Sequence, residues 1–251
     1  MKEQLLFFAD DDADPDLVRL TEQQIQRKAT HELPRDGSAR LVLMATAQGL
    51  AISNGLHTLR DDFTKMLPRI FPSNLNHELL IKASKFKKGI GSGTAVDATA
   101  GLGEDAFLLA AYGFQVQMYE RNPVIAMLLY DAMRRGQADY ELAPILSRMN
   151  LKMGDSIALI PALSFSPDLV LLDPMFPKRQ KSGLVKKKFQ LLHQLEQPCQ
   201  DEDVLLNAAL ACNPRRIIIK RPAAAENLAG KQPSYSLRGG TIRYDCIVCR
   251  S

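Results

Sequence analysis

The sequence contains no tryptophan, only four cysteines in 251 residues, and no apolar run as long as a membrane span. A helix that crosses a bilayer needs about 20 consecutive apolar residues. The first apolar stretch, Leu5–Ala9, is too short for the core of a signal peptide and runs directly into acidic residues. So few cysteines in a chain of this length do not indicate a disulfide scaffold. We therefore expect a cytoplasmic protein without a membrane partner.

Two of the cysteines, Cys246 and Cys249, form a C-x-x-C motif inside the apolar strand pattern TIRYDCIVC. Strand alternation sends residues three apart to opposite faces, and no second Cys or His pair stands nearby in the sequence. A zinc site needs four convergent ligands. The motif therefore predicts a structural role, and we expect no metal site.

Charge is unevenly distributed along the chain. The formal net charge is +4, and the first 16 residues carry −5, which leaves +9 for the remainder. A basic excess of this size suggests a polyanionic partner, although a solvated basic surface would give the same count. The apolar fraction of 46% is sufficient for a sizeable buried core.

Two kinds of pattern divide the chain. Residues 1–75 predict a small N-terminal α+β subdomain with a strand at LLFFA and an amphipathic helix after Asp14-Pro15-Asp16. Two further strands then turn at Gln48-Gly49. Residues 76–251 instead alternate between apolar strands (TAVDAT, FQVQMYE, DLVLLD, RRIIIK) and helices, and end in a hairpin. Such alternation predicts a doubly wound, Rossmann-like α/β core with a mostly parallel sheet and an antiparallel terminal hairpin. Its ligands should bind at the carboxyl ends of the strands.

The strand TAVDAT leads into a glycine loop. Gly101-x-Gly103-x-x-Ala106 fits the G-x-G-x-x-G/A nucleotide fingerprint, with a strand before it and a helix after it. Glu120 ends the next strand, where a carboxylate can bind both hydroxyls of a ribose. The fingerprint alone does not identify the ligand.

The charges around this loop favour one cofactor class. Asp97 ends the strand, and Glu104 and Asp105 open the helix. A carboxylate about 5 Å from a phosphate costs about 3 kcal/mol at an effective dielectric of 20, which disfavours a dinucleotide. S-adenosylmethionine has no phosphate and carries a sulfonium and an ammonium, so we expect it as the cofactor. The alternative, that Glu104 and Asp105 only complement the helix dipole, leaves Asp97 unexplained.

Asp155-Ser156 follows the strand-like run LKMG, at the position where many methyltransferases recognise adenine. The same residues also fit a turn with a helix cap. Both interpretations stay open.

The stretch LLDPMFP ends the fourth core strand, which should lie beside the first across the switch point of the sheet. Its Asp173-Pro174-Met175-Phe176 resembles the (Asp/Asn)-Pro-Pro-(Tyr/Phe) motif of methyltransferases that act on exocyclic amines of bases. In that role the Asp173 side chain and the Pro174 carbonyl would accept hydrogen bonds from the amine. Phe176 would stack on a base that has left its helix. We therefore assign Asp173, Pro174 and Phe176 as catalytic candidates.

A run of basic residues without an acid follows this motif: Lys178, Arg179, Lys181, Lys186, Lys187 and Lys188. A charge run is often only a solvated face, but one at the mouth of a base-stacking site favours contact with phosphates. Lys220 and Arg221, at the end of RRIIIK, should lie on the same edge and extend this patch.

The segments VDATAGLGEDAF, YERNP, LLDPMFPKRQKSGLVKKK and IIIKRP together resemble the bacterial ribosomal RNA small subunit methyltransferase J family. The resemblance implies a class I S-adenosylmethionine-dependent methyltransferase that modifies N2 of one guanosine in 16S ribosomal RNA, alone or in the small ribosomal subunit. It also implies cofactor contacts at Glu104-Asp105, Glu120-Arg121, Asp155-Ser156 and Asp173. The alternatives are a methyltransferase of a small-molecule amine, a non-catalytic RNA-binding module and a dinucleotide oxidoreductase.

Overall fold

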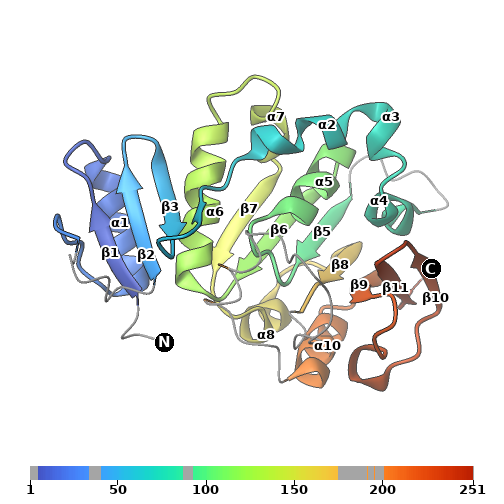
Figure 1. Ribbon diagram of the computed structural model, residues 1–251. Helices are drawn as coiled ribbons and strands as arrows, with labels where there is room; N and C mark the ends of the chain where they lie inside the picture. The colour runs from blue at the N-terminus through green and yellow to red at the C-terminus, as the bar shows by residue number, and fades with distance from the viewer. Residues whose placement is uncertain are drawn as a thin grey trace.

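The computed structural model describes residues 5–33, 41–86, 93–174, 191, 195 and 201–250. The chain forms two β-sheets, a small one from its N-terminal part and a larger one from the remainder, and helix α6 lies between them (Figure 1). Within the described ranges, no helix is both long and apolar enough to cross a bilayer.

The small sheet has the strand order β1-β2-β3-β4. Its elements are β1 (Leu5–Ala9), α1 (Pro15–Ile25), β2 (Leu41–Thr46), β3 (Gly49–Ser53) and β4 (Thr58–Leu59). β1 pairs in parallel with β2, because α1 carries the chain across, whereas β2, β3 and β4 are antiparallel. Asp14 caps α1 by accepting hydrogen bonds from the backbone N–H groups of Asp16 and Leu17. β1, α1, β2, β3 and the turn between β2 and β3 are those that the sequence predicts, and β4 is an addition to them.

A series of short helices connects the two sheets: η1 (Phe63–Met66), α2 (Leu67–Ile70), α3 (Pro72–Leu75) and α4 (Leu79–Ser84). Their buried residues belong to the core of the large sheet. The ring of Phe63, for example, stacks on that of Phe107 with 5.0 Å between centroids. We therefore propose that the N-terminal unit ends after β4, earlier than the composition change near residue 75 suggests.

The large sheet has the strand order β10-β11-β9-β8-β5-β6-β7. Its strands are β5 (Thr94–Asp97), β6 (Gln115–Glu120), β7 (Met149–Met153), β8 (Leu169–Leu172), β9 (Arg216–Pro222), β10 (Tyr235–Arg238) and β11 (Ile242–Val248). The five strands from β9 to β7 are parallel, and β10 and β11 form an antiparallel edge. β8 pairs with β5, so the switch point lies where the sequence predicts, and the doubly wound Rossmann-like fold is confirmed.

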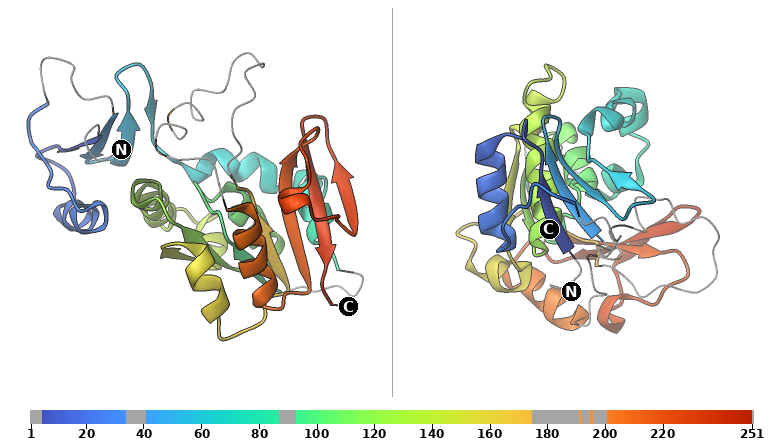
Figure 2. Two further views of the ribbon diagram at one scale, coloured as in Figure 1. Left: turned by 90° about the horizontal axis from the view of Figure 1, so that it is seen from below. Right: turned by 60° about the vertical axis from the view of Figure 1, so that its left-hand side comes forward.

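Helices cover both faces of the large sheet (Figures 1 and 2). They are α5 (Glu104–Tyr112), α6 (Pro123–Gly136), α7 (Ala143–Leu146), α8 (Ser156–Leu159), η2 (Ile160–Ala162), α10 (Glu202–Ala211) and η3 (Leu228–Gly230). α5 and α7 pack on one face, and α8 and α10 pack on the other. α6 contributes Leu129 to the core of the large sheet and Ile125 to a core shared with the small sheet.

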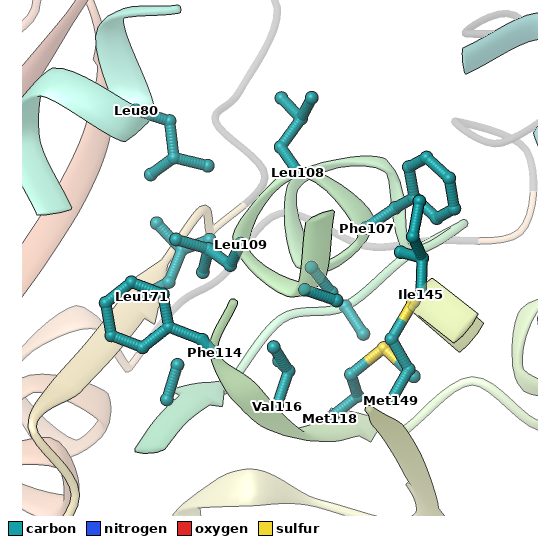
Figure 3. Packing of buried hydrophobic residues seen from close by; sticks show 14 of the residues in the cluster. Leu80, Phe107, Leu108, Leu109, Phe114, Val116, Met118, Ile145, Met149 and Leu171 are labelled. Carbon is teal, nitrogen blue, oxygen red and sulfur yellow. The ribbon is translucent and has the colours of Figure 1, made fainter. Parts of the chain in front are cut away.

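Successive side chains of β8 point to opposite faces of the sheet, and helices cover both faces, so every residue of the strand is apolar. Leu169 and Leu171 face the α5 side, whereas Val170 and Leu172 face the α10 side, and all four are buried. Figure 3 shows the α5 side, where leucines of α5 pack over β6 and β8. Burial of each such side chain contributes about 1.5–3 kcal/mol, so the strand ends that carry the polar groups are held by a rigid core.

Candidate active site

The glycine loop between β5 and α5 is held in place by the carboxylate of Glu120. Glu120 Oε2 accepts a hydrogen bond from the backbone N–H of Gly101 (2.9 Å), and Oε1 accepts one from that of Asn122 (2.7 Å). The side chain is buried, and burial raises its pKa although these two N–H groups pull it down. Glu120 therefore joins the end of β6 to the loop that follows β5.

The two glycines of the loop meet different constraints. Both have positive φ, +55° at Gly101 and +75° at Gly103, a conformation that suits glycine. A Cβ at Gly101 would meet no heavy atom within 4 Å, so the backbone there borders open space. A Cβ at Gly103 would lie 2.8 Å from Leu129 Cδ1, so this position is needed for packing against α6. Of the two, it is Gly101 that leaves room for a ligand beside the loop.

Asp97, the last residue of β5, is 2% exposed and accepts a hydrogen bond from the backbone N–H of Thr99 (3.1 Å). Burial raises the pKa of Asp97 to about 8, although the Thr99 N–H lowers it, and the charges of Asp105 and Asp173 add to the rise. In the free protein this carboxyl group is therefore mostly protonated at neutral pH. The loop is less negative than a simple count of its carboxylates suggests.

Asp173 and Pro174 follow β8 directly and are tied to the same loop. The backbone N–H of Asp173 donates to Thr99 Oγ1 (2.7 Å), and Pro174 is buried. Thr99, two residues before the first glycine of the loop, is not among the predicted site residues. Phe176, the third catalytic candidate, lies outside the described residues.

Lys220 and Arg221, which the sequence predicts to extend the basic patch, form ion pairs with carboxylates of the protein. Lys220 Nζ lies 2.7 Å from Asp105 Oδ2 and 2.9 Å from Asp173 Oδ2. The Arg221 side chain is 5% exposed and pairs with Glu202 Oε1 at 2.9 Å. Arg221 is therefore paired inside the protein, whereas Lys220 is paired at a partly exposed position, and contact of either cation with RNA stays a prediction. The basic residues Lys178, Arg179, Lys181, Lys186, Lys187 and Lys188 lie outside the described residues.

The remaining candidate site residues lie just after the carboxyl ends of β5, β6 and β7. Asp155 caps α8, since its Oδ1 accepts from the backbone N–H of Ile157 (2.9 Å), and the neighbouring Ser156 is buried. The helix-cap interpretation therefore holds, and a cofactor contact here stays a prediction. Glu104 and Arg121 are exposed at the starts of the segments that follow β5 and β6.

The cysteines of the C-x-x-C motif differ in burial, with Cys246 buried and Cys249 exposed, and both are free thiols. In the described part of the chain, no group of three or more His, Cys, Asp or Glu side chains is arranged to hold a metal ion.

An open glycine loop and several carboxylates meet at the switch point of a Rossmann-like sheet, and these features suit a nucleoside cofactor that carries positive charge. They define a class I methyltransferase that uses S-adenosylmethionine, in agreement with a match of residues 26–249 to the family model described as "Putative SAM-dependent methyltransferase". The chain belongs to the ribosomal RNA small subunit methyltransferase J family, as its resemblance predicts.

Three relatives illustrate this similarity. The ribosomal RNA small subunit methyltransferase J of Dechloromonas aromatica (strain RCB) is 38% identical over 226 residues, which cover 87% of this chain and 92% of that protein. The protein of the same name from Pseudomonas syringae pv. syringae (strain B728a) is 39% identical over 218 residues, which cover 84% of this chain and 80% of that one. The crystal structure of a SAM-dependent methyltransferase from Neisseria gonorrhoeae matches with a TM-score of 0.77 and 30% identity, covering 97% of this chain and 95% of that one.

Proposed function

We propose that this protein transfers a methyl group from S-adenosylmethionine to the exocyclic N2 of a specific guanosine in 16S ribosomal RNA, in the cytoplasm. The observation that carries the proposal is the hydrogen bond from Asp173 N–H to Thr99 Oγ1. It fixes a motif that suits an aryl amine directly against the loop that suits the cofactor. The names of the relatives, which are methyltransferases of the small ribosomal subunit's RNA, support this choice of substrate.

The residues around the glycine loop are assigned to the cofactor. Each oxygen of Glu120 already accepts one backbone N–H, and a carboxylate has further lone pairs with which to accept from ribose hydroxyls. The open side of Gly101 admits the ligand close to the backbone. Asp97 becomes a counter-charge once a cation lies beside it, and Asp155-Ser156 are assigned to the adenine end.

The residues after β8 are assigned to the amine. Hydrogen bonds from the NH₂ group to the Asp173 side chain and the Pro174 carbonyl would favour a tetrahedral nitrogen whose lone pair is available. When bound, S-adenosylmethionine supplies the methyl carbon, which forms a bond to nitrogen as its bond to sulfur breaks and sulfur keeps the electron pair. The nitrogen then loses one proton, for which we assign Asp173 as the first acceptor. Because the displacement is in-line, positioning supplies much of the acceleration.

The basic run after the motif is assigned to the phosphates of the RNA. Lys178, Arg179, Lys181, Lys186, Lys187 and Lys188 supply positive charge within a short stretch of the sequence. Contacts of this kind give affinity but not base specificity. Binding of the target amine and its base is therefore assigned to Asp173, Pro174 and Phe176.

The decisive experiment is mass spectrometry of nucleosides from 16S ribosomal RNA of a strain that lacks this gene, before and after incubation of its small subunits with the protein and S-adenosylmethionine. N2-methylguanosine should appear at one site. Asp173→Ala should abolish the product while the circular dichroism spectrum stays that of the folded protein, and the exposed Asp12→Ala serves as the matched control. Near-normal turnover by Asp173→Ala would refute its role. Methylation of small amines without methylation of RNA would favour the alternative substrate class.

A further inference from the structure

Lys220 lies at the carboxyl edge of the large sheet and bridges two carboxylates from different elements. It stands near the carboxyl end of β9, and its side chain is 26% exposed. Its Nζ contacts Oδ2 of Asp105, in the first turn of α5, at 2.7 Å. The same Nζ contacts Oδ2 of Asp173, after β8, at 2.9 Å. One ammonium group therefore links the cofactor loop side of the site to the proposed amine-binding side.

The strand pairing explains why this lysine points into the site. Lys220 lies directly opposite Tyr244 of the antiparallel strand β11, and residues paired in this way share one face of a sheet. Tyr244 is 4% exposed and belongs to the core on the α5 face. The lysine stem therefore leaves β9 on the side of α5, and its charge emerges at the sheet edge where Asp105 and Asp173 lie.

Charged or titratable groups from several elements surround the Lys220–Asp173 pair. Asp97 of β5, Asp105 of α5 and Tyr244 of β11 interact electrostatically with one or both members, and Arg69 of α2 acts on Tyr244. Burial raises the pKa of Asp173, the Lys220 ammonium pulls it down, and the charge of Asp105 pushes it up again. Burial alone would lower the pKa of Lys220, but the charges of Asp105 and Asp173 outweigh it and raise that pKa, so the lysine stays charged. Lys220 is thus the cation that opposes protonation of Asp173.

We propose that Lys220 is a positioning residue for methyl transfer: it keeps Asp173 a carboxylate and occupies its Oδ2, so that Oδ1 is the oxygen assigned to the amine. This inference rests on the proposed function, and it adds a residue that contacts neither the methyl group nor the base. A protonated Asp173 would offer a donor on one oxygen and would be a weaker acceptor for the amine N–H. Asp105 also pairs with the Lys220 ammonium and thereby limits how far that ammonium lowers the pKa of Asp173.

A purely structural role for Lys220 would have a different signature. Removal of a packing interaction or an ion pair lowers the free energy of unfolding, but it leaves the pH dependence of the folded enzyme unchanged. A positioning role instead moves the acidic limb of the pH profile of kcat/KM, because that limb reports the ionisation of Asp173. The pH profile is therefore the deciding measurement.

The first test compares Lys220→Met, Lys220→Arg and the exposed control Lys231→Met in RNA methylation at saturating S-adenosylmethionine. Lys220→Met should move the acidic limb of kcat/KM up by about one to two pH units, and so lower kcat/KM by about tenfold or more at pH values on that limb. Part of the missing activity should return as the pH rises. Lys220→Arg should keep the limb near that of the wild type, because the charge remains. An unmoved limb in Lys220→Met overturns the proposal.

A second variant tests the competition of Asp105 and Asp173 for the Lys220 ammonium in the opposite direction. It gives an answer even if Lys220→Met does not fold. Asp105→Asn removes the competing carboxylate, so Lys220 serves Asp173 alone. The acidic limb should then move down, by up to about one pH unit. An upward shift, or none, contradicts the proposal even if S-adenosylmethionine binds more weakly to this variant.

A readout without turnover separates this inference from the proposed function. Carbon-13 NMR of the aspartate carboxyl groups, with Asp173→Asn to assign the signal, follows the titration of Asp173 directly. The pKa of Asp173 should rise in Lys220→Met and fall in Asp105→Asn. If the wild type does not methylate ribosomal RNA, the proposed function fails while this titration still reports the ion pair. If RNA is methylated and the Asp173 signal does not respond to either variant, only the role of Lys220 fails.

Discussion

The carboxylate of Asp131, inside α6, accepts a hydrogen bond at 2.8 Å from the backbone N–H of Leu50, in strand β3 of the small sheet. Asp131 is fully buried, and its Oδ2 also accepts from Arg135 Nε at 2.8 Å. Arg135 in turn donates to the backbone carbonyl of Asp61. A Cβ at Gly49 would lie 2.3 Å from Asp131 Oδ2, so glycine at this position allows the contact. The small sheet is therefore attached to α6 by a buried polar network as well as by apolar packing.

Replacement of Asp131 by alanine should destabilise the protein by about 3 kcal/mol, because it leaves the Leu50 N–H and the Arg135 guanidinium without their buried acceptor. Urea unfolding followed by circular dichroism measures this change in stability. The exposed Asp12→Ala is the control and should stay within about 0.5 kcal/mol of the wild type. A destabilisation below about 1 kcal/mol for Asp131→Ala would mean that this buried network contributes little to the attachment of the small sheet.

Asp97 should make the folded protein less stable as the pH rises. Its folded pKa of about 8 lies above the ordinary value of 3.8, so between these values the folded state binds more protons than the unfolded state. Stability from this group is therefore full below the ordinary value and declines as the pH approaches 8. Asp97→Asn keeps an acceptor for Thr99 N–H and avoids the buried charge. Its gain in melting temperature over the wild type should grow from acidic pH to about pH 8, and a constant difference would contradict the shifted pKa.

The same carboxyl group should couple binding of S-adenosylmethionine to the release of a proton. A cation placed beside Asp97 favours its charged form, so below about pH 8 binding must displace a proton. The affinity of the wild type should rise with pH and level off above that value, whereas that of Asp97→Asn should be weaker and independent of pH in this range. Calorimetry in two buffers of different ionisation enthalpy counts the protons released. Release of none by the wild type would place the cofactor charge away from Asp97.

The two loop glycines should respond differently to alanine. Gly101→Ala should cost only about 1 kcal/mol of stability, which is the cost of the left-handed conformation. Its methyl group enters the open side of the loop, so the Kd for S-adenosylmethionine should rise by about tenfold or more. Gly103→Ala adds a clash with Leu129 and should cost about 2–4 kcal/mol in unfolding experiments. Equal effects of the two variants on affinity and on stability would argue against separate roles.

The basic run should give RNA binding its salt dependence. Replacement of Lys186, Lys187 and Lys188 by glutamine should reduce the slope of log K against log salt by about 0.7–0.9 for each phosphate that these lysines neutralise. The Kd for S-adenosylmethionine should not change. Fluorescence anisotropy with a 16S ribosomal RNA fragment over a salt series measures the slope.

The matched control for the basic run replaces three exposed lysines elsewhere by glutamine: Lys65, Lys82 and Lys231. A slope that falls equally in both triple variants would indicate a diffuse effect of net charge.

Much of the fold and part of the site can be predicted from local patterns. Alternation of apolar strands with helices predicts the parallel sheet, and the position of β8 beside β5 follows from the switch-point rule. The carboxyl ends of parallel strands meet at one edge, so Asp97, Glu120 and Asp173 could be expected together. The fingerprint predicts both glycines. Why each must be glycine, open space at Gly101 and packing against Leu129 at Gly103, depends on neighbours from other elements.

The pairing of charges could not be predicted in the same way. Lys220 and Asp105 are 115 positions apart, and Leu50 and Asp131 are 81 apart. Periodicity places Tyr244 on the core face of its strand, but it does not say that Lys220 lies opposite it. The positive residues at the end of β9 suggest a basic patch, and their sequence does not show that both form ion pairs with carboxylates from other elements.

The amino-acid sequence by itself determined the α/β architecture, the glycine loop, the motif after β8 and the family, because each depends on residues close together in the chain. Tertiary structure alone decided which carboxylates are neutralised, that Thr99 anchors Asp173, and that α6 serves both sheets. The physical reason is burial: a charge or a hydrogen-bonding group removed from water must find its partner among whatever side chains the fold brings near, however distant they are along the chain.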